Sequence, residues 1–99
     1  MTKFVTFHDL KGKSVFITGG GSGIGASLTD GFMEQGANVA FVQRSDSFKF
    51  VEEMELKHGR APLFIKCDIT NVVALQLAMK QAETAHGPIT VVVNNAAND

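Results

Sequence analysis

The chain has 99 residues, and its 9 basic and 10 acidic side chains give a formal net charge of −1. This length allows one domain, and the small net charge gives no electrostatic reason to expect a nucleic acid or an anionic membrane as a partner. One cysteine excludes an intramolecular disulfide framework and, with three scattered histidines, argues against a zinc site.

The first predicted elements are a strand, a glycine-rich turn and a helix. Residues 13–18 contain the continuous apolar run Val15-Phe16-Ile17, which is typical of a strand buried on both faces of a parallel sheet. Glycines dominate residues 19–23, and the next residues predict a helix that runs to about Gln35 and stops before Gly36. Apolar side chains at helical spacing predict its inward face: Ile24, Leu28 and Phe32.

A second strand and a second helix follow. Residues 38–42 form another short apolar run. Ser45 or Asp46 is suited to cap a helix that runs to about His58 and stops at Gly59. Three apolar residues predict the inward face of this helix: Phe48, Val51 and Met54. The apolar run within residues 62–66 then predicts a third strand.

The last helix and strand complete an alternating pattern. Thr70 is suited to cap a helix that ends at His86-Gly87-Pro88, where a possible cation, a glycine and a proline are typical of a helix C-terminus. Apolar residues at helical spacing predict the inward face: Val72, Leu75, Met79 and Ala82. Residues 89–93 predict the fourth strand, and residues 94–99 follow it.

The order βαβαβαβ predicts an α/β fold with a doubly wound parallel sheet of the Rossmann type, right-handed crossovers and strand order 3-2-1-4. In this order the fourth strand is an edge, although the run Val91-Val92-Val93 is typical of a central strand. Sheets normally do not leave an apolar edge uncovered. We therefore expect residues 1–99 to form an incomplete domain, which either continues in a larger chain or is completed by a partner, with residues 1–12 as an N-terminal arm.

The glycine-rich turn has the composition of a phosphate-binding loop. Glycines between a buried strand and a helix let the backbone approach a phosphate, and the N–H groups at the start of the helix stabilise its charge. Ser22 adds a hydroxyl donor, and Gly25 permits close packing of helix on strand. No Gly-Lys-Ser/Thr sequence is present, which excludes a P-loop. The alternative is a strand–helix turn without a ligand.

Three motifs together resemble the short-chain dehydrogenase/reductase family. Thr18-Gly-x-x-x-Gly23-Ile-Gly25 is similar to the cofactor motif of that family. Asp68-Ile69 is similar to its acidic motif after the third strand, and Asn94-Asn95-Ala96-Ala97 to its Asn-Asn-Ala-Gly motif after the fourth. The three motifs occur in the family's order, and the resemblance implies an NAD(P)-binding Rossmann domain.

The resemblance assigns the site residues. It places the pyrophosphate and the adenosine ribose on the turn, and the ribose also beside the residues after the fourth strand. It implies that Asp68 bonds the adenine amino group and that Ile69 lies against the ring, although Asp68 is also suited to cap the helix after Thr70. Asn94 would brace the sheet through backbone hydrogen bonds, and Ala97 replaces the family's glycine. The implied cofactor-binding residues are Gly19, Gly21, Ser22, Gly23, Ile24, Gly25, Asp68, Ile69, Asn95, Ala96 and Ala97.

The choice between NADP and NAD depends on the end of the second strand, where members that prefer NAD usually carry an acidic residue. The aligned residue here is Gln43, which can bond to a ribose hydroxyl and does not repel a 2′-phosphate. Arg44 follows it and could pair with that phosphate or stack on adenine, so Gln43 and Arg44 complete the implied cofactor-binding residues. These two residues favour NADP(H) or dual use. In the alternative, Arg44 is simply solvated and NAD binds through Gln43, with Asp46 nearby in the sequence.

The family's chemistry uses a Ser-Tyr-Lys arrangement with a helper Asn, all beyond the fourth strand. This chain has no tyrosine, so a catalytic residue is not assigned and the 99 residues alone are expected to be inactive.

The residues Leu10-Lys-Gly-Lys13 and the ending Asn98-Asp99 further resemble the bacterial sugar dehydrogenases of the family, those for xylose in particular. The alternatives are a 3-oxoacyl or other carbonyl reductase and a non-catalytic nucleotide-binding module.

Several other features have simpler interpretations. No segment is apolar enough for a signal peptide or a membrane span, which predicts a cytoplasmic protein. The family resemblance implies a small-molecule alcohol, sugar or carbonyl substrate and, for a full-length chain, a homo-oligomer. Cys67 is expected to be a small buried residue, and His58 and His86 are expected to act at helix ends rather than on a metal.

Overall fold

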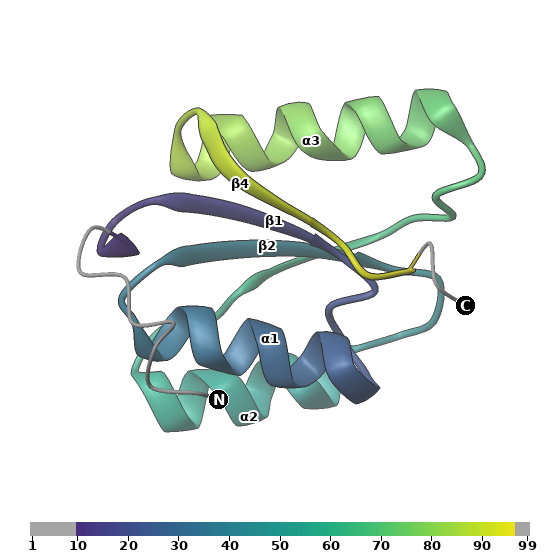
Figure 1. The fold of residues 1–99 in the computed structure, drawn as a ribbon. Coiled ribbons are helices and arrows are strands. Elements are labelled where there is room, and N and C mark those ends of the chain that lie inside the picture. Colours follow the sequence, from purple (N-terminus) through teal and green to yellow (C-terminus); the bar gives the residue numbers. More distant parts are fainter. Residues whose placement is uncertain (1–9, 97–99) are drawn as a thin grey trace.

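The computed structural model describes residues 10–96 and shows a four-stranded parallel sheet with helices on both faces (Figure 1). The elements in chain order are β1 (Ser14–Thr18), α1 (Gly23–Glu34), β2 (Asn38–Gln43), α2 (Phe48–His58), β3 (Leu63–Lys66), α3 (Val72–His86) and β4 (Ile89–Asn94). The strand order is β3-β2-β1-β4. The predicted α/β class, doubly wound topology and strand order are therefore confirmed.

The register brings three strand ends together at one edge of the sheet. Thr18, the last residue of β1, pairs with Val42 of β2 on one side and with Asn94 of β4 on the other. The loops that follow these strands therefore start side by side. Such an edge, at the point where the strand order reverses direction, is where doubly wound sheets bind their ligands.

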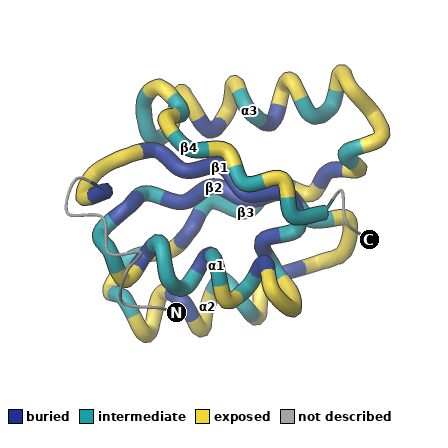
Figure 2. Tube along the Cα trace, in the orientation of Figure 1, coloured by how far each residue is buried: buried dark blue, intermediate teal, exposed yellow. Residues whose placement is uncertain are grey.

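The sheet is packed on both faces, as Figure 2 shows by the dark blue of its central strands. Alternate residues of β1 face opposite layers, so that Val15 and Ile17 join the core under α1 and α2 while Phe16 joins the core under α3. All five residues of β1 are buried. The continuous apolar run of the first strand therefore has the predicted cause. Over residues 10–96, no helix has the length and apolar character needed to cross a membrane.

Three residues predicted on inward helix faces are instead exposed. Ile24, Phe48 and Val72 have 74%, 67% and 63% of their surface accessible, so these predictions were wrong. Each lies in the first turn of its helix, directly after a loop at the sheet edge. Packing on the core starts further along each helix. The first apolar residues of the three helices that pack against the core are Leu28, Phe50 and Ala74, and the exposed ring of Phe48 only lies edge-on to Phe64.

The helix ends also differ in part from the predictions. Gly36 (φ 90°), Gly59 (φ 79°) and Gly87 (φ 90°) end the three helices as expected. The N-caps, however, are Ser47 rather than Ser45 or Asp46, and Asn71 rather than Thr70.

Local hydrogen bonds explain both cap differences. Asp46 lies one residue before the N-cap Ser47, yet its carboxylate accepts from the N–H of Phe48, the first residue of α2, at 2.9 Å, so Asp46 in part fills the capping role predicted for it. Thr70 donates to the Asp68 carboxylate through both its N–H (3.0 Å) and its hydroxyl (2.7 Å). Asn71 is then the residue whose side chain accepts from the first turn of α3, at the N–H of Ala74 (3.0 Å).

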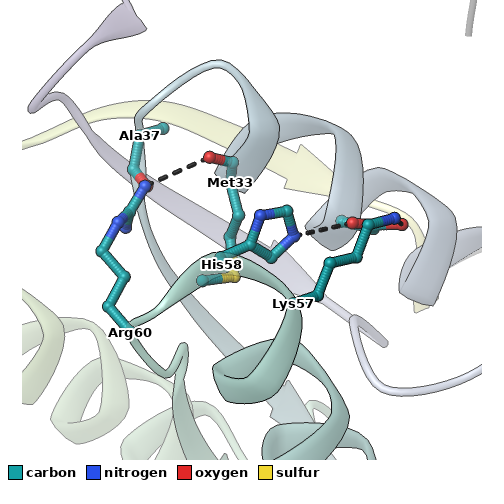
Figure 3. Close-up of polar contacts among 6 residues, drawn as sticks. Met33, Ala37, Lys57, His58 and Arg60 are labelled. Atoms are coloured by element: carbon teal, nitrogen blue, oxygen red, sulfur yellow. Dashed lines mark hydrogen bonds and ion pairs between the residues drawn. The ribbon is translucent and has the colours of Figure 1, made fainter.

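A polar cluster joins α1 to α2 and to the residues after them (Figure 3). The Asp30 carboxylate accepts from Lys57 Nζ at 2.8 Å and lies 2.7 Å from Nε2 of His58. The Arg60 guanidinium donates to the carbonyl groups of Ala37 (2.8 Å) and Met33 (3.1 Å). His58 therefore forms an interhelical contact in addition to lying in the last turn of its own helix, as predicted.

Candidate functional site

The glycines Gly19, Gly23 and Gly25, between β1 and the start of α1, meet three different structural demands. Gly19 (φ +70°) and Gly23 (φ +56°) have left-handed backbone that other residues adopt at a cost. A Cβ on Gly25 would overlap the carbonyl oxygen of Gly19, so only glycine lets α1 start this close to the turn. A Cβ on Gly23 would meet nothing within 4 Å, so this residue faces open space. Tight turning, close helix packing and an open backbone face are the three demands of a pyrophosphate-binding turn.

Hydrogen bonds from three parts of the chain hold the turn in place. Gly19 donates to the carbonyl of Val42 (2.8 Å) and accepts from Nδ2 of Asn95 (3.2 Å). The carbonyl of Gly20 accepts from the buried hydroxyl of Thr29 (2.9 Å). The sequence analysis missed Thr29. Its signal is a polar residue in the stripe of residues 25, 29 and 33, which are the buried positions of α1.

Gln43 also binds the turn, through both ends of its side-chain amide. Oε1 accepts from the N–H of Gly21 at 3.0 Å, and Nε2 donates to Oγ of Ser22 at 3.2 Å. The predicted partner of Gln43 was a ribose hydroxyl. The structure instead gives its amide two partners within the protein, and both of them are residues of the predicted cofactor-binding set.

The residues after β4 are fixed to the end of β1. The hydroxyl of Thr18 donates to Oδ1 of Asn94 (3.1 Å) and accepts from the N–H of Ala96 (3.0 Å). Asn94 therefore ties β4 to β1 through its side chain as well as through the strand pairing. Three predicted features, namely Ala97, the Asn98-Asp99 ending and most of the arm over residues 1–12, lie outside the described residues.

A cavity of about 250 Å³ opens beside the turn. It brings together residues from the ends of all four strands: Gly19, Val42, Gln43, Arg44, Cys67, Asp68, Ile69, Thr70 and Ala96. Pockets for whole drug-sized ligands measure roughly 300–1,000 Å³. This cavity therefore fits one part of a larger ligand, such as a nucleobase.

The other predicted residues lie in the turn or contact it. Gly21, Ser22, Gly23, Ile24 and Gly25 belong to the turn and the start of α1, and Asn95 reaches Gly19. Cys67 is buried as expected, but its place in the cavity lining was not predicted.

Asp68 gives the cavity an ionised acceptor. Hydrogen bonds from the backbone and side chain of Thr70 lower the pKa of its carboxyl, and the charge of Arg44 acts in the same direction. Both bonds from Thr70 go to Oδ1. Within residues 10–96, Oδ2 has no such partner and is left for a donor such as an exocyclic amine. The two interpretations of Asp68, as a local structural residue and as a ligand-binding one, are therefore compatible.

The polar cluster between α1 and α2, described above with Asp30, Lys57 and His58, does not line this cavity. Ligand-type atoms of Asp30, Glu34 and His58 lie within 4.8 Å of one another. The ammonium group of Lys57 already neutralises Asp30, so the cluster is an interhelical ion pair. His86 differs from its predicted role as a possible cation, because burial, and then the charge of Arg60, lowers the pKa of its imidazole.

Comparison with known proteins gives consistent relatives. A family profile described as "short chain dehydrogenase" matches residues 13–98. The chain is 45% identical over 95 residues to a probable galactose dehydrogenase, GalD, of Rhizobium meliloti, covering 94% of this chain and 37% of that protein. It is 44% identical over 94 residues to D-xylose 1-dehydrogenase of Caulobacter vibrioides, covering 94% and 36%. The chain thus spans little more than a third of the length of these relatives.

Solved structures match in the same way. A short-chain dehydrogenase/reductase from Serratia marcescens superposes with a TM-score of 0.78 at 35% identity, covering 87% of this chain and 36% of that one. A blue fluorescent protein from a metagenomic library, in complex with NADPH, has a TM-score of 0.76 at 35% identity, covering 85% and 36%. An NADPH-dependent 3-quinuclidinone reductase from Rhodotorula rubra has a TM-score of 0.77 at 28% identity, covering 86% and 33%.

Proposed function

This chain belongs to the short-chain dehydrogenase family, and we propose that it is the cofactor-binding part of an NAD(P)-dependent oxidoreductase that acts on a sugar. The observation that carries the proposal is the division of tasks among Gly19, Gly23 and Gly25, beside a cavity sized for part of a ligand. The open face of Gly23 supports the proposal by its place at the sheet edge beside this cavity, since Gly12 has the same open, left-handed backbone at the opposite edge.

The residues fit the adenosine half of a dinucleotide. The N–H groups at the start of α1 and the open face of Gly23 would hold the pyrophosphate. Oδ2 of Asp68 would accept from the adenine amino group, and Ile69 supplies an apolar surface in the same cavity. When bound, the nicotinamide ring of such a cofactor supplies the hydride chemistry. The protein's task at this site is to bind and orient the other half.

The charges around the cavity support NADP(H) as the preferred cofactor. Arg44 lines the cavity, and the residue before it is an uncharged glutamine. Asp46, which kept NAD as an alternative, is not among the residues that line the cavity. Two of the structural neighbours are described with NADPH.

The preference is tested by replacing the cation. Arg44→Ala should weaken NADPH binding about tenfold, as expected for a lost hydrogen bond between charged groups, and should weaken NADH binding much less. Lys49→Ala is the matched control, because it removes the same charge from an exposed position near the start of α2. Equal losses of NADPH and NADH affinity in Arg44→Ala would contradict the preference.

A sugar substrate is supported by the galactose and xylose dehydrogenases among the relatives. The competing proposal, a carbonyl reductase, is supported by the 3-quinuclidinone reductase among the structural neighbours. Steady-state assays of the full-length protein on a panel of aldoses and of ketones, each with NAD(H) and NADP(H), distinguish the two. The favoured proposal fails if only ketones are turned over.

We further propose that the Ser-Tyr-Lys group and the rest of the domain lie in sequence outside this chain. The proposal is supported by apolar surface on β4 and α3, where the exposed residues are Val92, Val72, Val73 and Leu77. The intact mass of the native protein tests it. A mass near 10.6 kDa, the value for this chain, would contradict it and favour a stand-alone nucleotide-binding module.

A further inference from the structure

We propose that Gln43 sets the direction of the Ser22 hydroxyl hydrogen, and thereby makes Ser22 a donor to an anionic oxygen of the cofactor. The inference rests on the function proposed above and deepens it. It makes Gln43 a positioning residue that favours a 2′-phosphate through Ser22, rather than a residue that binds the ribose itself.

The orientation of the Gln43 amide follows from its first partner. The backbone N–H of Gly21 is only a donor, so the amide atom that faces it at 3.0 Å is the oxygen. The nitrogen must then face Ser22, at 3.2 Å from Oγ. An amide nitrogen donates and does not accept. Ser22 therefore accepts this hydrogen bond with a lone pair.

This leaves the hydrogen of Ser22 without a place inside the protein. A serine at a helix N-cap commonly accepts from an N–H of the first turn. Ser22 is the N-cap of α1, yet its side chain makes no such bond to the described helix. Because Ser22 accepts from Gln43, its single hydrogen cannot point toward Gln43, and within residues 10–96 it has no acceptor, so it is free to point to solvent. Ser22 is exposed, so this donor faces the solvent beside the turn.

The ligand oxygen that matches this donor is an anionic one. A phosphate oxygen is an acceptor, whereas a ribose hydroxyl both donates and accepts and gains less from a fixed donor. Arg44 follows Gln43 in the sequence, and both line the cavity, so a cation lies on the same side of the turn as the residue that orients Ser22. The directed chain from Gly21 through Gln43 to Ser22 therefore favours adenosine that carries a 2′-phosphate.

Glutamate at the position of Gln43 would reverse the direction of the hydrogen bond between this residue and Ser22. A carboxylate of the same shape accepts from Gly21 N–H as before, so the turn keeps its support. It would also accept from the Ser22 hydroxyl, which turns the hydrogen inward. In a Gln43→Glu background, Ser22 is thus no longer an outward donor. If Gln43→Glu acted only through its added negative charge, Ser22→Ala would weaken nucleotide binding by the same factor in both backgrounds.

The experiment is a double-mutant cycle on the full-length protein, read out by calorimetric titration with adenosine 2′,5′-bisphosphate and with 5′-AMP. Ser22→Ala should weaken binding of the bisphosphate about tenfold in the wild-type background and less than about twofold in Gln43→Glu. Binding of 5′-AMP should change less than about twofold on Ser22→Ala in either background. Ser22→Thr, which keeps the hydroxyl on an extended backbone (φ −152°), should restore bisphosphate binding.

Three outcomes would overturn the inference. An equal effect of Ser22→Ala in both backgrounds would show that Gln43 acts by charge alone. No effect of Ser22→Ala in the wild type would show that Ser22 is not a donor to the ligand. Binding of neither adenosine nucleotide by the wild-type protein would overturn this inference together with the proposed function, whereas the first two outcomes leave the proposed function standing.

Discussion

A substitution at Gly23 can test whether this glycine is needed only for the fold or also for binding the cofactor. Its backbone is left-handed (φ +56°), and a Cβ there would meet nothing within 4 Å. Gly12 has the same two properties, with φ +76° and open space around it. It precedes β1, whereas Gly23 follows that strand, so the two glycines lie at opposite edges of the sheet. Gly23→Ala and Gly12→Ala are thus a matched pair.

The two substitutions should destabilise the protein equally. An L-residue in left-handed backbone costs roughly 1–2 kcal/mol, and the loss of chain freedom in the unfolded state returns about 0.5 kcal/mol. The expected loss in the free energy of unfolding is therefore about 1 kcal/mol for each variant. Neither variant adds a clash, because neither methyl group has a neighbour.

Only Gly23→Ala should lose affinity for the cofactor. Its methyl group would stand where the backbone must approach a pyrophosphate. In Gly23→Ala we expect the dissociation constant for NADPH to rise at least tenfold, which corresponds to about 1.4 kcal/mol. In Gly12→Ala we expect no change in this constant. Urea unfolding gives the stabilities and titration of NADPH fluorescence gives the affinities. Equal affinities in the two variants would refute the assignment of the open face at Gly23 to the ligand.

Three further predictions concern charged and buried side chains. Burial raises the pKa of Asp30, but hydrogen bonds from Lys57 and His58 outweigh it and lower the pKa below its ordinary 3.8. The charged carboxylate thus stabilises the fold above about pH 4 and stops doing so as the pH falls through the lowered pKa. Urea unfolding should accordingly show Asp30→Asn less stable than the wild type at pH 7, with the difference closing in acid; a constant difference would contradict this. Arg60→Ala should cost about 1–3 kcal/mol, since two carbonyl groups lose a charged donor, and an unchanged urea midpoint would argue against that role. Burial, and then the charge of Asp68, raises the pKa of Cys67, so iodoacetamide should react slowly at pH 7 and more slowly still with 5′-AMP bound; a rate equal to that of free cysteine would speak against both effects.

Strand positions could be predicted from the sequence to within about one residue. Each strand is a short apolar run that ends at a glycine or a polar residue. The runs of β1 and β2 are continuous because these strands are buried on both faces, whereas β4 alternates half-buried and exposed residues. The helix faces were harder. Periodicity identifies which side of a helix is apolar, but it does not say where along its length the helix meets the sheet. Ile24, Phe48 and Val72 follow the predicted periodicity and are exposed because they precede that point.

The site shows the same division between local and long-range information. The glycine spacing could be predicted because the demands on Gly19, Gly23 and Gly25 are set by the backbone itself. The partner of Gln43 could not, since its amide bonds to a residue 22 positions away, and only the alignment of β2 beside β1 brings the two together. The hydrogen bond from Asn95 to Gly19 spans 76 positions for the same reason.

These long-range bonds explain why the turn is formed before any ligand arrives. The carbonyl of Gly19 is held by Asn95, the carbonyl of Gly20 by Thr29 and the N–H of Gly21 by Gln43, and these partners come from three separate parts of the chain. The ordering of the turn is thus completed during folding, so little of it remains as a cost of binding. The groups left over are the outward hydroxyl of Ser22 and the first N–H groups of α1, and all of them are donors. Within the described residues, the turn thus has the carbonyl groups of Gly19 and Gly20 paired and the N–H groups at the start of α1 available, which suits an anion.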